Sequence, residues 1–171
     1  VNRIVLVASL GGGTGCGMIT QLARILKENI NEDTRLRVIL ISPFNDEDIR
    51  AFKNSAIAIK AMEDLRIPVR IVSNGNFESR EGRTLQEIHS AINNYVVETE
   101  FILNEANNHK TTGINTDEAE ISTTLFAPGY QFVARVKLST KDKEKNTREI
   151  IQKMKNSLDF GFDKESGYDY R

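Results

Sequence analysis

The feature that most constrains this chain is a glycine-rich segment, GGGTGCG, which places five glycines within residues 11–17. A short β-branched run at residues 4–7 precedes it, and apolar residues recur at helical spacing from Met18 through Leu22 and Ile25. Glycine costs backbone entropy, so this density between a strand and a helix needs a reason. The usual reason is close approach of backbone N–H groups to an anion at a helix N-terminus. The segment predicts an anion-binding turn between a strand and an amphipathic helix.

Two common phosphate-binding loops do not fit these residues. A P-loop requires lysine after its last glycine, where this chain has Met18. The dinucleotide fingerprint requires three glycines at fixed positions, and the third position falls on Cys16 or Met18, depending on the register. It also requires an acidic residue after the second strand, where Ser42 and Pro43 stand.

Strand and helix patterns alternate along the next part of the chain. Apolar runs at residues 36–41 and 68–72 predict two further strands, and residues 45–65 predict a helix capped by Asn45. A turn follows at residues 73–76. Three strands separated by two helices predict parallel βαβ units with right-handed crossovers.

A capping box at Thr84 and Glu87 opens the longest apolar pattern, which runs to residue 106 and predicts a helix of about 24 residues. A helix of this length is typical of a bridge between two domains. The fold class is therefore α/β: a three-layer, Rossmann-like parallel sheet with flanking helices, a long central helix and the start of a second α+β domain.

The C-terminal third gives weaker patterns. We expect a short helix over residues 117–126, a strand over residues 130–138 and a last helix from Ile150 or Ile151 to Leu158. Residues 134–155 hold eight basic and three acidic side chains. Both an ordinary solvated surface and a surface for an acidic partner fit this stretch.

Composition excludes several classes of protein. The chain is 39% hydrophobic, which is enough to form a core, and no apolar run approaches the roughly 20 residues of a membrane span. A net charge of −1 argues against a protein that coats nucleic acid. A single cysteine excludes a disulfide scaffold and fits a reducing, cytoplasmic location.

Two segments carry a resemblance to a known family. GGGTGCG resembles the signature loop of the FtsZ/tubulin superfamily of GTPases, in which Thr or Ser usually stands where this chain has Cys16. Residues 113–120, GINTDEAE, resemble the superfamily's synergy loop. The Asp-x-x-Glu form of its acid pair is more similar to the plasmid- and phage-encoded TubZ branch. The resemblance implies GTP as the nucleotide, Mg²⁺ as its ion, and head-to-tail assembly of identical subunits into a protofilament.

The same resemblance implies site residues. Those implied to bind the nucleotide come from the glycine loop, the two following loops and the start of the long helix: Gly11, Gly12, Gly13, Thr14, Gly15, Cys16, Gly17, Glu47, Arg50, Asn74, His89 and Asn93. Within this set, Glu47 is implied to contact the ribose and Arg50 a phosphate. His89 is implied to stack on guanine, and Asn93 to bind the base edge. No protein side chain is implied as a direct metal ligand.

The implied catalytic residues are Asn115, Asp117 and Glu120, which would be delivered to the nucleotide of the neighbouring subunit. Asp117 and Glu120 are three apart at a helix start, so they point the same way. Carboxylates repel phosphate but can polarise a water molecule, which fits delivery in trans. Plain helix capping by acidic residues is the alternative for this pair, and ordinary solvent exposure is the alternative for His89 and Asn93.

The domain division that follows is residues 1–83 as the C-terminal half of a GTPase domain, 84–112 as the central helix and linker, and 113–171 as the synergy loop and the start of an activation domain. We expect the chain to be an internal portion of a longer protein. A G-x-G-G-x-G loop encoded upstream would indicate a fragment of a GTPase, and its absence would favour a degenerate module. The implied function is a filament-forming GTPase in plasmid or phage DNA segregation or in cell division. It would reach DNA or a division or partition complex through an adaptor, without contacting membrane or nucleic acid itself.

Two other functions stay open. One is a non-catalytic polymer or adaptor domain that keeps the fold. The other is an unrelated α/β enzyme acting on phosphate esters, although His89 and His109 both lie far from the glycine loop in sequence.

Overall fold

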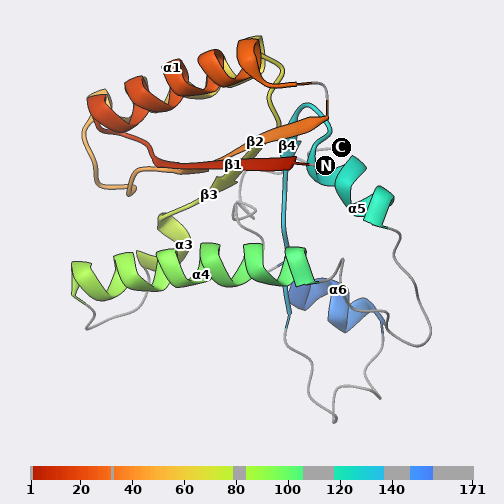
Figure 1. Cartoon of the computed structure of the whole chain (residues 1–171). Coiled ribbons are helices and arrows are strands. Elements are labelled where there is room, and N and C mark those ends of the chain that lie inside the picture. The colour runs from red at the N-terminus through yellow and green to blue at the C-terminus, as the bar shows by residue number, and fades with distance from the viewer. Residues whose placement is uncertain (1, 32, 79–83, 106–117, 137–146, 156–171) are drawn as a thin grey trace.

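The computed structural model describes residues 2–31, 33–78, 84–105, 118–136 and 147–155 (Figure 1). The helices and strands within these ranges are β1 (Asn2–Ser9), α1 (Gly13–Asn29), β2 (Thr34–Ile41), α2 (Ile49–Asp64), β3 (Val69–Val72), α3 (Gly75–Glu78), α4 (Leu85–Glu105), α5 (Glu118–Leu125), β4 (Tyr130–Gln131) and α6 (Thr147–Lys155).

The four strands form one sheet in the order β1-β2-β3-β4, and all neighbouring pairs are parallel. β1 and β2 pair over eight residues, from Asn2 opposite Thr34 to Ser9 opposite Ile41. Parallel strands joined by α1 and α2 confirm the predicted βαβ organisation.

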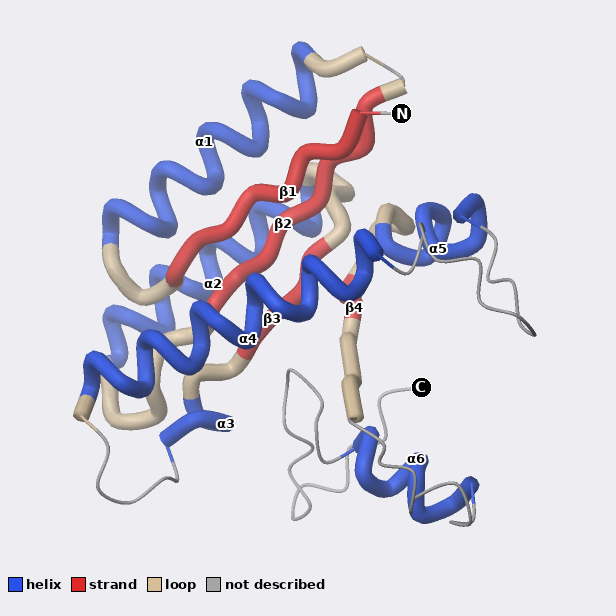
Figure 2. Tube along the Cα trace, turned by 60° about the horizontal axis from the view of Figure 1, so that its bottom comes forward, coloured by secondary structure: helices blue, strands red, loops and turns tan. Residues whose placement is uncertain are grey.

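The strand predicted over residues 130–138 is wrong in length, because β4 has only two residues and pairs with Val69 and Arg70 of β3. Beyond it the chain leaves the sheet, as Figure 2 shows. Arg135 then contacts α4: its guanidinium group lies 4.5 Å from the centre of the Tyr95 ring and forms an ion pair with Glu98. Contact with α4 therefore replaces continued strand pairing.

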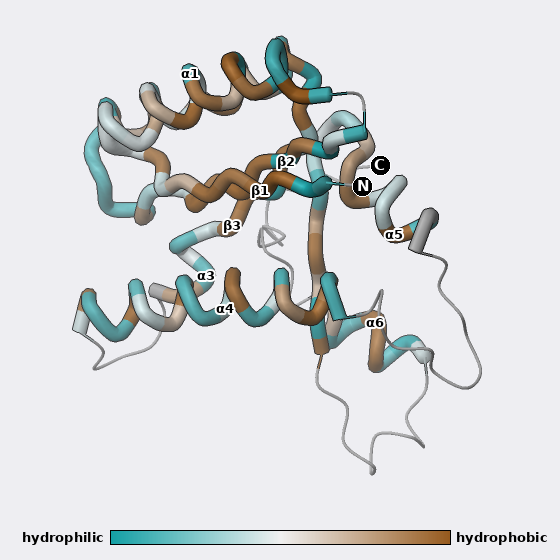
Figure 3. The backbone as a smooth tube through the Cα atoms, in the orientation of Figure 1, coloured by the Kyte–Doolittle hydropathy of each residue, from teal (hydrophilic) through white to brown (hydrophobic). Residues whose placement is uncertain are grey.

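Helices cover both faces of the sheet, which gives the predicted three layers (Figures 1 and 2). On one face, Leu36, Val38 and Leu40 of β2 pack with residues of α1 and α2. On the other, Ile39 and Ile41 pack with α4. Figure 3 shows the matching hydropathy, with apolar strands at the centre and mixed helices outside. The apolar run of β2 is thus buried on both faces, as expected for a central parallel strand.

The apolar pattern of α1 packs only in part on the sheet. The buried residues of the helix are Cys16, Ile19 and Ala23, and Leu26 packs against the same core. Met18, by contrast, is 66% exposed, and Leu22 is also exposed. Cys16 and Ala23, two of the three buried residues, have small side chains that let the helix axis approach the sheet closely.

One predicted helix cap is confirmed and one is wrong. The Glu87 carboxylate accepts a hydrogen bond from the Thr84 backbone N–H (2.7 Å), and the Glu87 N–H donates to the Thr84 hydroxyl oxygen (3.3 Å), as a capping box requires. The cap of α2 is Asp48, not Asn45. The Glu47 N–H donates to the Phe44 carbonyl oxygen, so the chain makes a turn before α2 begins.

None of the helices in the described ranges combines the length and the apolar character that crossing a bilayer requires.

Candidate nucleotide site

The segments that follow β1, β2 and β3 meet at the carboxyl edge of the sheet. The Leu10 N–H donates to the Ile41 carbonyl oxygen (2.8 Å), and the Ser42 N–H donates to that of Val72 (2.9 Å). The Ser42 hydroxyl oxygen in turn accepts from the Asn74 N–H at 3.3 Å. This edge is where open parallel sheets bind their ligands.

The glycine segment forms the N-terminus of α1. The helix begins at Gly13, five residues before Met18, so only Gly11 and Gly12 stand outside it. Gly11 has a φ of 101°, which suits glycine. No side chain caps the helix, and its first turn holds no acidic residue. The first backbone N–H groups of this 17-residue helix therefore have no carboxylate of their own turn as a partner. Such a helix N-terminus can bind an anion.

Gly15 is required by the packing of this turn. A Cβ atom there would lie 2.2 Å from the Ser9 carbonyl oxygen, which is backbone and cannot move aside. A Cβ at Gly12, Gly13 or Gly17 would meet nothing within 4 Å. The open space lies over the helix N-terminus, where an anion would bind.

The loop after β2 lies against the glycine segment. A Cβ built on Gly11 would be 3.4 Å from a carboxylate oxygen of Glu47. The Asn54 side chain of α2 donates to the Gly11 carbonyl oxygen at 3.0 Å and fixes the turn. Sequence reasoning placed Glu47 at the site but missed Asn54, for which no pattern gave a signal.

Asn74 is 5% exposed, and its Oδ1 has no hydrogen-bond partner among the described residues. A buried acceptor without a donor costs about 1–3 kcal/mol. A donor such as a ring N–H or a hydroxyl group of a ligand would satisfy it. This atom therefore fits the predicted role of Asn74 in nucleotide binding.

The start of α4 joins the same edge through an aromatic contact. The His89 ring stacks on the Phe44 ring, with centroids 5.6 Å apart and an interplanar angle of 17°. Asn93 follows one turn later on α4 and is exposed. Phe44 was not predicted as a site residue, although it stands beside Glu47 in the loop after β2.

The remaining predicted residues are Arg50 and the three implied catalytic residues. Arg50 forms an ion pair with Asp48 (2.9 Å), and this hydrogen bond is the main reason that the pKa of Asp48 lies below its usual value. Asn115 and Asp117 lie outside the described residues. Glu120 is exposed on α5.

α5 stands at the other end of the sheet from the glycine segment (Figures 1 and 2). Phe126 and Pro128, just after α5, line a pocket together with Thr34 at the amino end of β2. The eight residues of β1 and β2 that separate the two ends span about 26 Å. Glu120 therefore cannot reach the glycine segment of its own chain.

The described residues contain no group of three or more His, Cys, Asp or Glu side chains that could hold a metal ion.

Comparison with known proteins gives a family match over the first part of the chain. Residues 1–79 match the model of the Tubulin/FtsZ family, GTPase domain. On this match, residues 1–79 belong to the FtsZ/tubulin superfamily. The family match covers the glycine segment and the loops after β2 and β3. A comparison with curated protein sequences found no match.

Solved structures extend the fold to nearly the whole chain. CetZ2 from Haloferax volcanii, described as a GTPγS-bound protofilament, is 22% identical with a TM-score of 0.75, and the match covers 94% of this chain and 47% of that one. CetZ from Methanosaeta thermophila gives 20% identity and a TM-score of 0.70, with 93% and 44% covered. TubZ from Clostridium botulinum phage c-st gives 16% and 0.64, with 91% and 46% covered. The chain spans just under half the length of these proteins, and the likeness shows their common fold.

Proposed function

We propose that the chain is part of a filament-forming protein of the tubulin/FtsZ type that binds and hydrolyses GTP. The observation that carries this proposal is the uncapped, glycine-built N-terminus of α1 at the carboxyl edge of a parallel sheet, within a segment that matches the family's GTPase domain. The triphosphate is the substrate of the reaction. Its phosphates would lie over Gly12 and Gly13, where the free N–H groups stabilise negative charge.

The base and sugar would lie toward α4 and the loop after β2. His89 offers a ring face, Asn93 a side-chain amide and Asn74 a buried acceptor, while Glu47 stands beside Gly11 for a ribose hydroxyl. No described cluster of protein ligands could hold a metal ion. Mg²⁺ would therefore be bound through the phosphate oxygens, where it neutralises their charge.

Hydrolysis is completed by the neighbouring subunit. Glu120 stands at the opposite end of the sheet from its own glycine segment, which supports delivery of its carboxylate to the nucleotide of another copy. Glu120 and Asp117, with Asn115, would orient and polarise the attacking water. A head-to-tail protofilament follows from this arrangement, because each subunit then offers a nucleotide at one end and carboxylates at the other.

A complementation experiment tests the trans arrangement. The Glu120→Ala variant should bind GTP like the parent and lose turnover, whereas Glu28→Ala, which removes an exposed acid on α1, should keep both binding and turnover. A His89→Ala/Asn93→Ala variant should bind GTP poorly but keep its catalytic carboxylates. Mixing it with Glu120→Ala should restore turnover, because one copy supplies the nucleotide and the other the acid. Normal hydrolysis by Glu120→Ala alone would refute catalysis by this residue, and no recovery on mixing would refute its action in trans.

The cellular role we propose is segregation of plasmid or phage DNA or cell division, through an adaptor that links the filament to its cargo. The acid pair in the Asp-x-x-Glu form supports the first of these. Because the chain alone is expected to carry an incomplete nucleotide site, the deciding test uses the full-length gene product. If that product fails to bind GTP but still assembles, a non-catalytic polymer domain is the better description.

A further inference from the structure

A pocket of about 350 Å³ opens at the amino ends of the strands, which is the opposite end of the sheet from the glycine segment. Its lining comes from the end of α1, the start of β2, the turn before β3 and the segment after α5: Lys27, Ile30, Asn31, Thr34, Arg35, Leu36, Arg66, Ile67, Pro68, Phe126 and Pro128. Three of these residues are cationic and none is acidic. The exposed acids Glu28 and Asp33 lie on neighbouring segments without lining the pocket. The pocket therefore favours a negatively charged occupant.

The three cations are available for such an occupant. Lys27, Arg35 and Arg66 are all exposed, and none forms a hydrogen bond or ion pair through its side chain within the described part of the chain. Unpaired cations around an apolar floor such as Ile67 and Phe126 can gain charge-assisted hydrogen bonds without breaking existing ones.

Arg66 occupies a position that normally takes glycine. Its φ is 52°, in the left-handed region, at the end of α2. The Arg66 N–H donates to the Glu63 carbonyl oxygen (2.9 Å) and the Ile67 N–H to that of Met62 (3.0 Å), the pattern of a Schellman motif. An L side chain costs about 1–2 kcal/mol here relative to glycine. Arginine at this position thus places a cation in the pocket at a cost in folding free energy.

The matching negative charge stands at the opposite edge of the same sheet. Asp46, Glu47 and Asp48 are consecutive exposed acids in the loop between β2 and α2. Asp48 is held by Arg50 and by the first turn of α2, and Glu47 lies beside Gly11. Asp46 forms no such contact with a described residue and is free for a partner.

We propose that this pocket receives the Asp46 loop of a second copy of the chain, with Arg35 and Arg66 of one copy facing Asp46 of the next. The inference deepens the proposed function and rests on it for the head-to-tail direction. This contact and the approach of Glu120 to the next copy's nucleotide edge can form together, because the Asp46 loop flanks the glycine segment and the pocket flanks α5. Docking the loop in the pocket therefore brings Glu120 of one copy toward the nucleotide edge of the other.

The decisive variant is Arg66→Gly, because glycine relieves the positive φ while it removes the cation. Its melting temperature should equal or exceed that of the parent. Its self-association, measured by sedimentation velocity and light scattering at 50 mM and 300 mM salt, should weaken about tenfold at the lower salt concentration. Arg24→Glu, an exposed cation on α1 outside the pocket, is the matched control and should leave association unchanged.

Charge reversal identifies the partner. Asp46→Arg and Arg66→Asp should each abolish association, and the chain carrying both changes should recover it, because each head-to-tail contact then pairs opposite charges again. Unchanged association of Arg66→Gly, failure of the double reversal or a parent that stays monomeric would overturn the proposal. A parent that assembles through Arg66 but does not hydrolyse GTP would instead refute the proposed function and leave this contact standing.

Discussion

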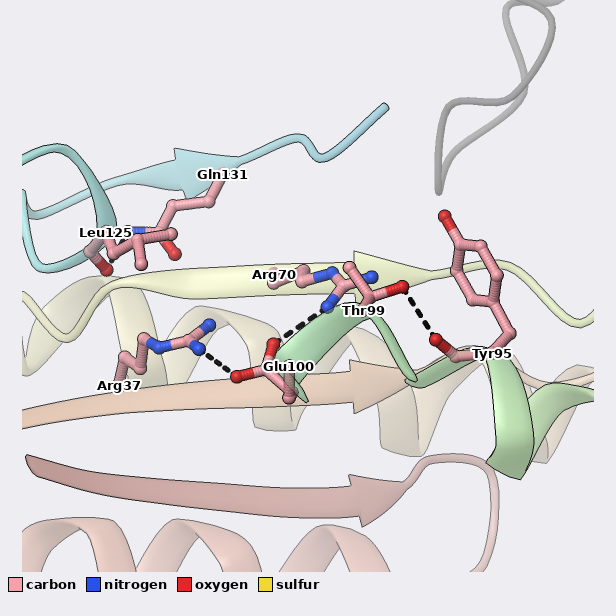
Figure 4. A network of polar contacts seen from close by, with 7 residues as sticks. All are labelled: Arg37, Arg70, Tyr95, Thr99, Glu100, Leu125 and Gln131. Atoms are coloured by element: carbon pink, nitrogen blue, oxygen red, sulfur yellow. Dashed lines mark hydrogen bonds and ion pairs between the residues drawn. The ribbon is translucent and has the colours of Figure 1, made fainter. Parts of the chain in front are cut away.

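Replacing Glu100 with glutamine should remove a carboxylate that pairs with two buried guanidinium groups. Arg37 on β2 and Arg70 on β3 have side-chain exposures of 4% and 0%, and both form ion pairs with the Glu100 carboxylate of α4, the second at 2.9 Å (Figure 4). Burial lowers the pKa of Arg37, and the attraction of Glu100 opposes that shift. Glutamine keeps the size and one acceptor but removes the charge, so this change isolates the electrostatic contribution.

The expected cost follows from breaking a buried pair. Removing one partner of a buried ion pair typically destabilises by 3–5 kcal/mol, so we expect about 4 kcal/mol for Glu100→Gln. For a chain of this length, this corresponds to a fall of about 8–16 °C in melting temperature. Glu98 lies two residues earlier on α4, is 66% exposed and pairs with Arg135 at 3.0 Å. Glu98→Gln is the matched control and should cost about 0–1 kcal/mol.

Urea unfolding followed by circular dichroism measures both costs, provided that the m-value stays constant. A Glu100→Gln variant whose free energy of unfolding lies within 1 kcal/mol of the parent's at an unchanged m-value would refute the reasoning.

A second variant removes a cation of the cluster instead of its carboxylate. Arg37 has two nitrogen atoms, Nε and Nη1, without hydrogen-bond partners, so Arg37→Met removes these along with one of the two cations. It should therefore cost less than Glu100→Gln.

Two further changes test the site and the packing around it. Gly15→Ala should destabilise α1 and abolish nucleotide binding, because its Cβ would lie against the Ser9 carbonyl oxygen. A Cβ at Gly17 meets nothing within 4 Å, so Gly17→Ala should stabilise the helix by up to about 1 kcal/mol. Thermal melting checks both changes, and GTP titration checks the loss of binding in Gly15→Ala. Burial and a hydrogen bond to Glu63 raise the pKa of Tyr130 to about 12, above its unfolded value of about 10. The stability that this gives relative to Tyr130→Phe should be constant below pH 10 and lost as the pH rises toward 12; a difference in melting temperature that does not change over this range would contradict the assignment.

Features set by local sequence were predictable. The capping box at Thr84 and Glu87 depends on residues three apart, and the structure contains both of its hydrogen bonds. The strand–glycine–helix order at residues 4–30 was also correct, since the strand, the glycine turn and the amphipathic helix each depend on local sequence. The cap of α2 was not, because Asn45, Asp46 and Asp48 can all cap a helix and the turn at Phe44 decides among them.

Features set by distant contacts were not predictable in detail. Arg37 and Arg70 each interrupt an apolar strand. A charged residue inside such a strand indicates a buried charge, which must be paired. Their partner, Glu100, lies 63 and 30 residues away, and only the placement of α4 across the sheet brings it to them. The outward stripe of α1 at Met18 has the same origin, because periodicity gives the spacing of apolar residues but not the face that packs on the sheet.

The buried charges also determine how α4 is rotated at the nucleotide edge. An apolar cluster in their place could stabilise the fold as well, but apolar contact is non-directional and would leave the rotation of the helix less defined. The Glu100 carboxylate pairs with Arg37 on β2 and with Arg70 on β3, so its position relative to both strands is fixed. His89 lies 11 residues before Glu100, and Asn93 lies seven residues before it. These separations are about three turns and two turns of α-helix, so all three residues stand on nearly the same face. The Arg37–Glu100–Arg70 cluster therefore orients the side chains that we assign to the base, although it lies several turns away from them.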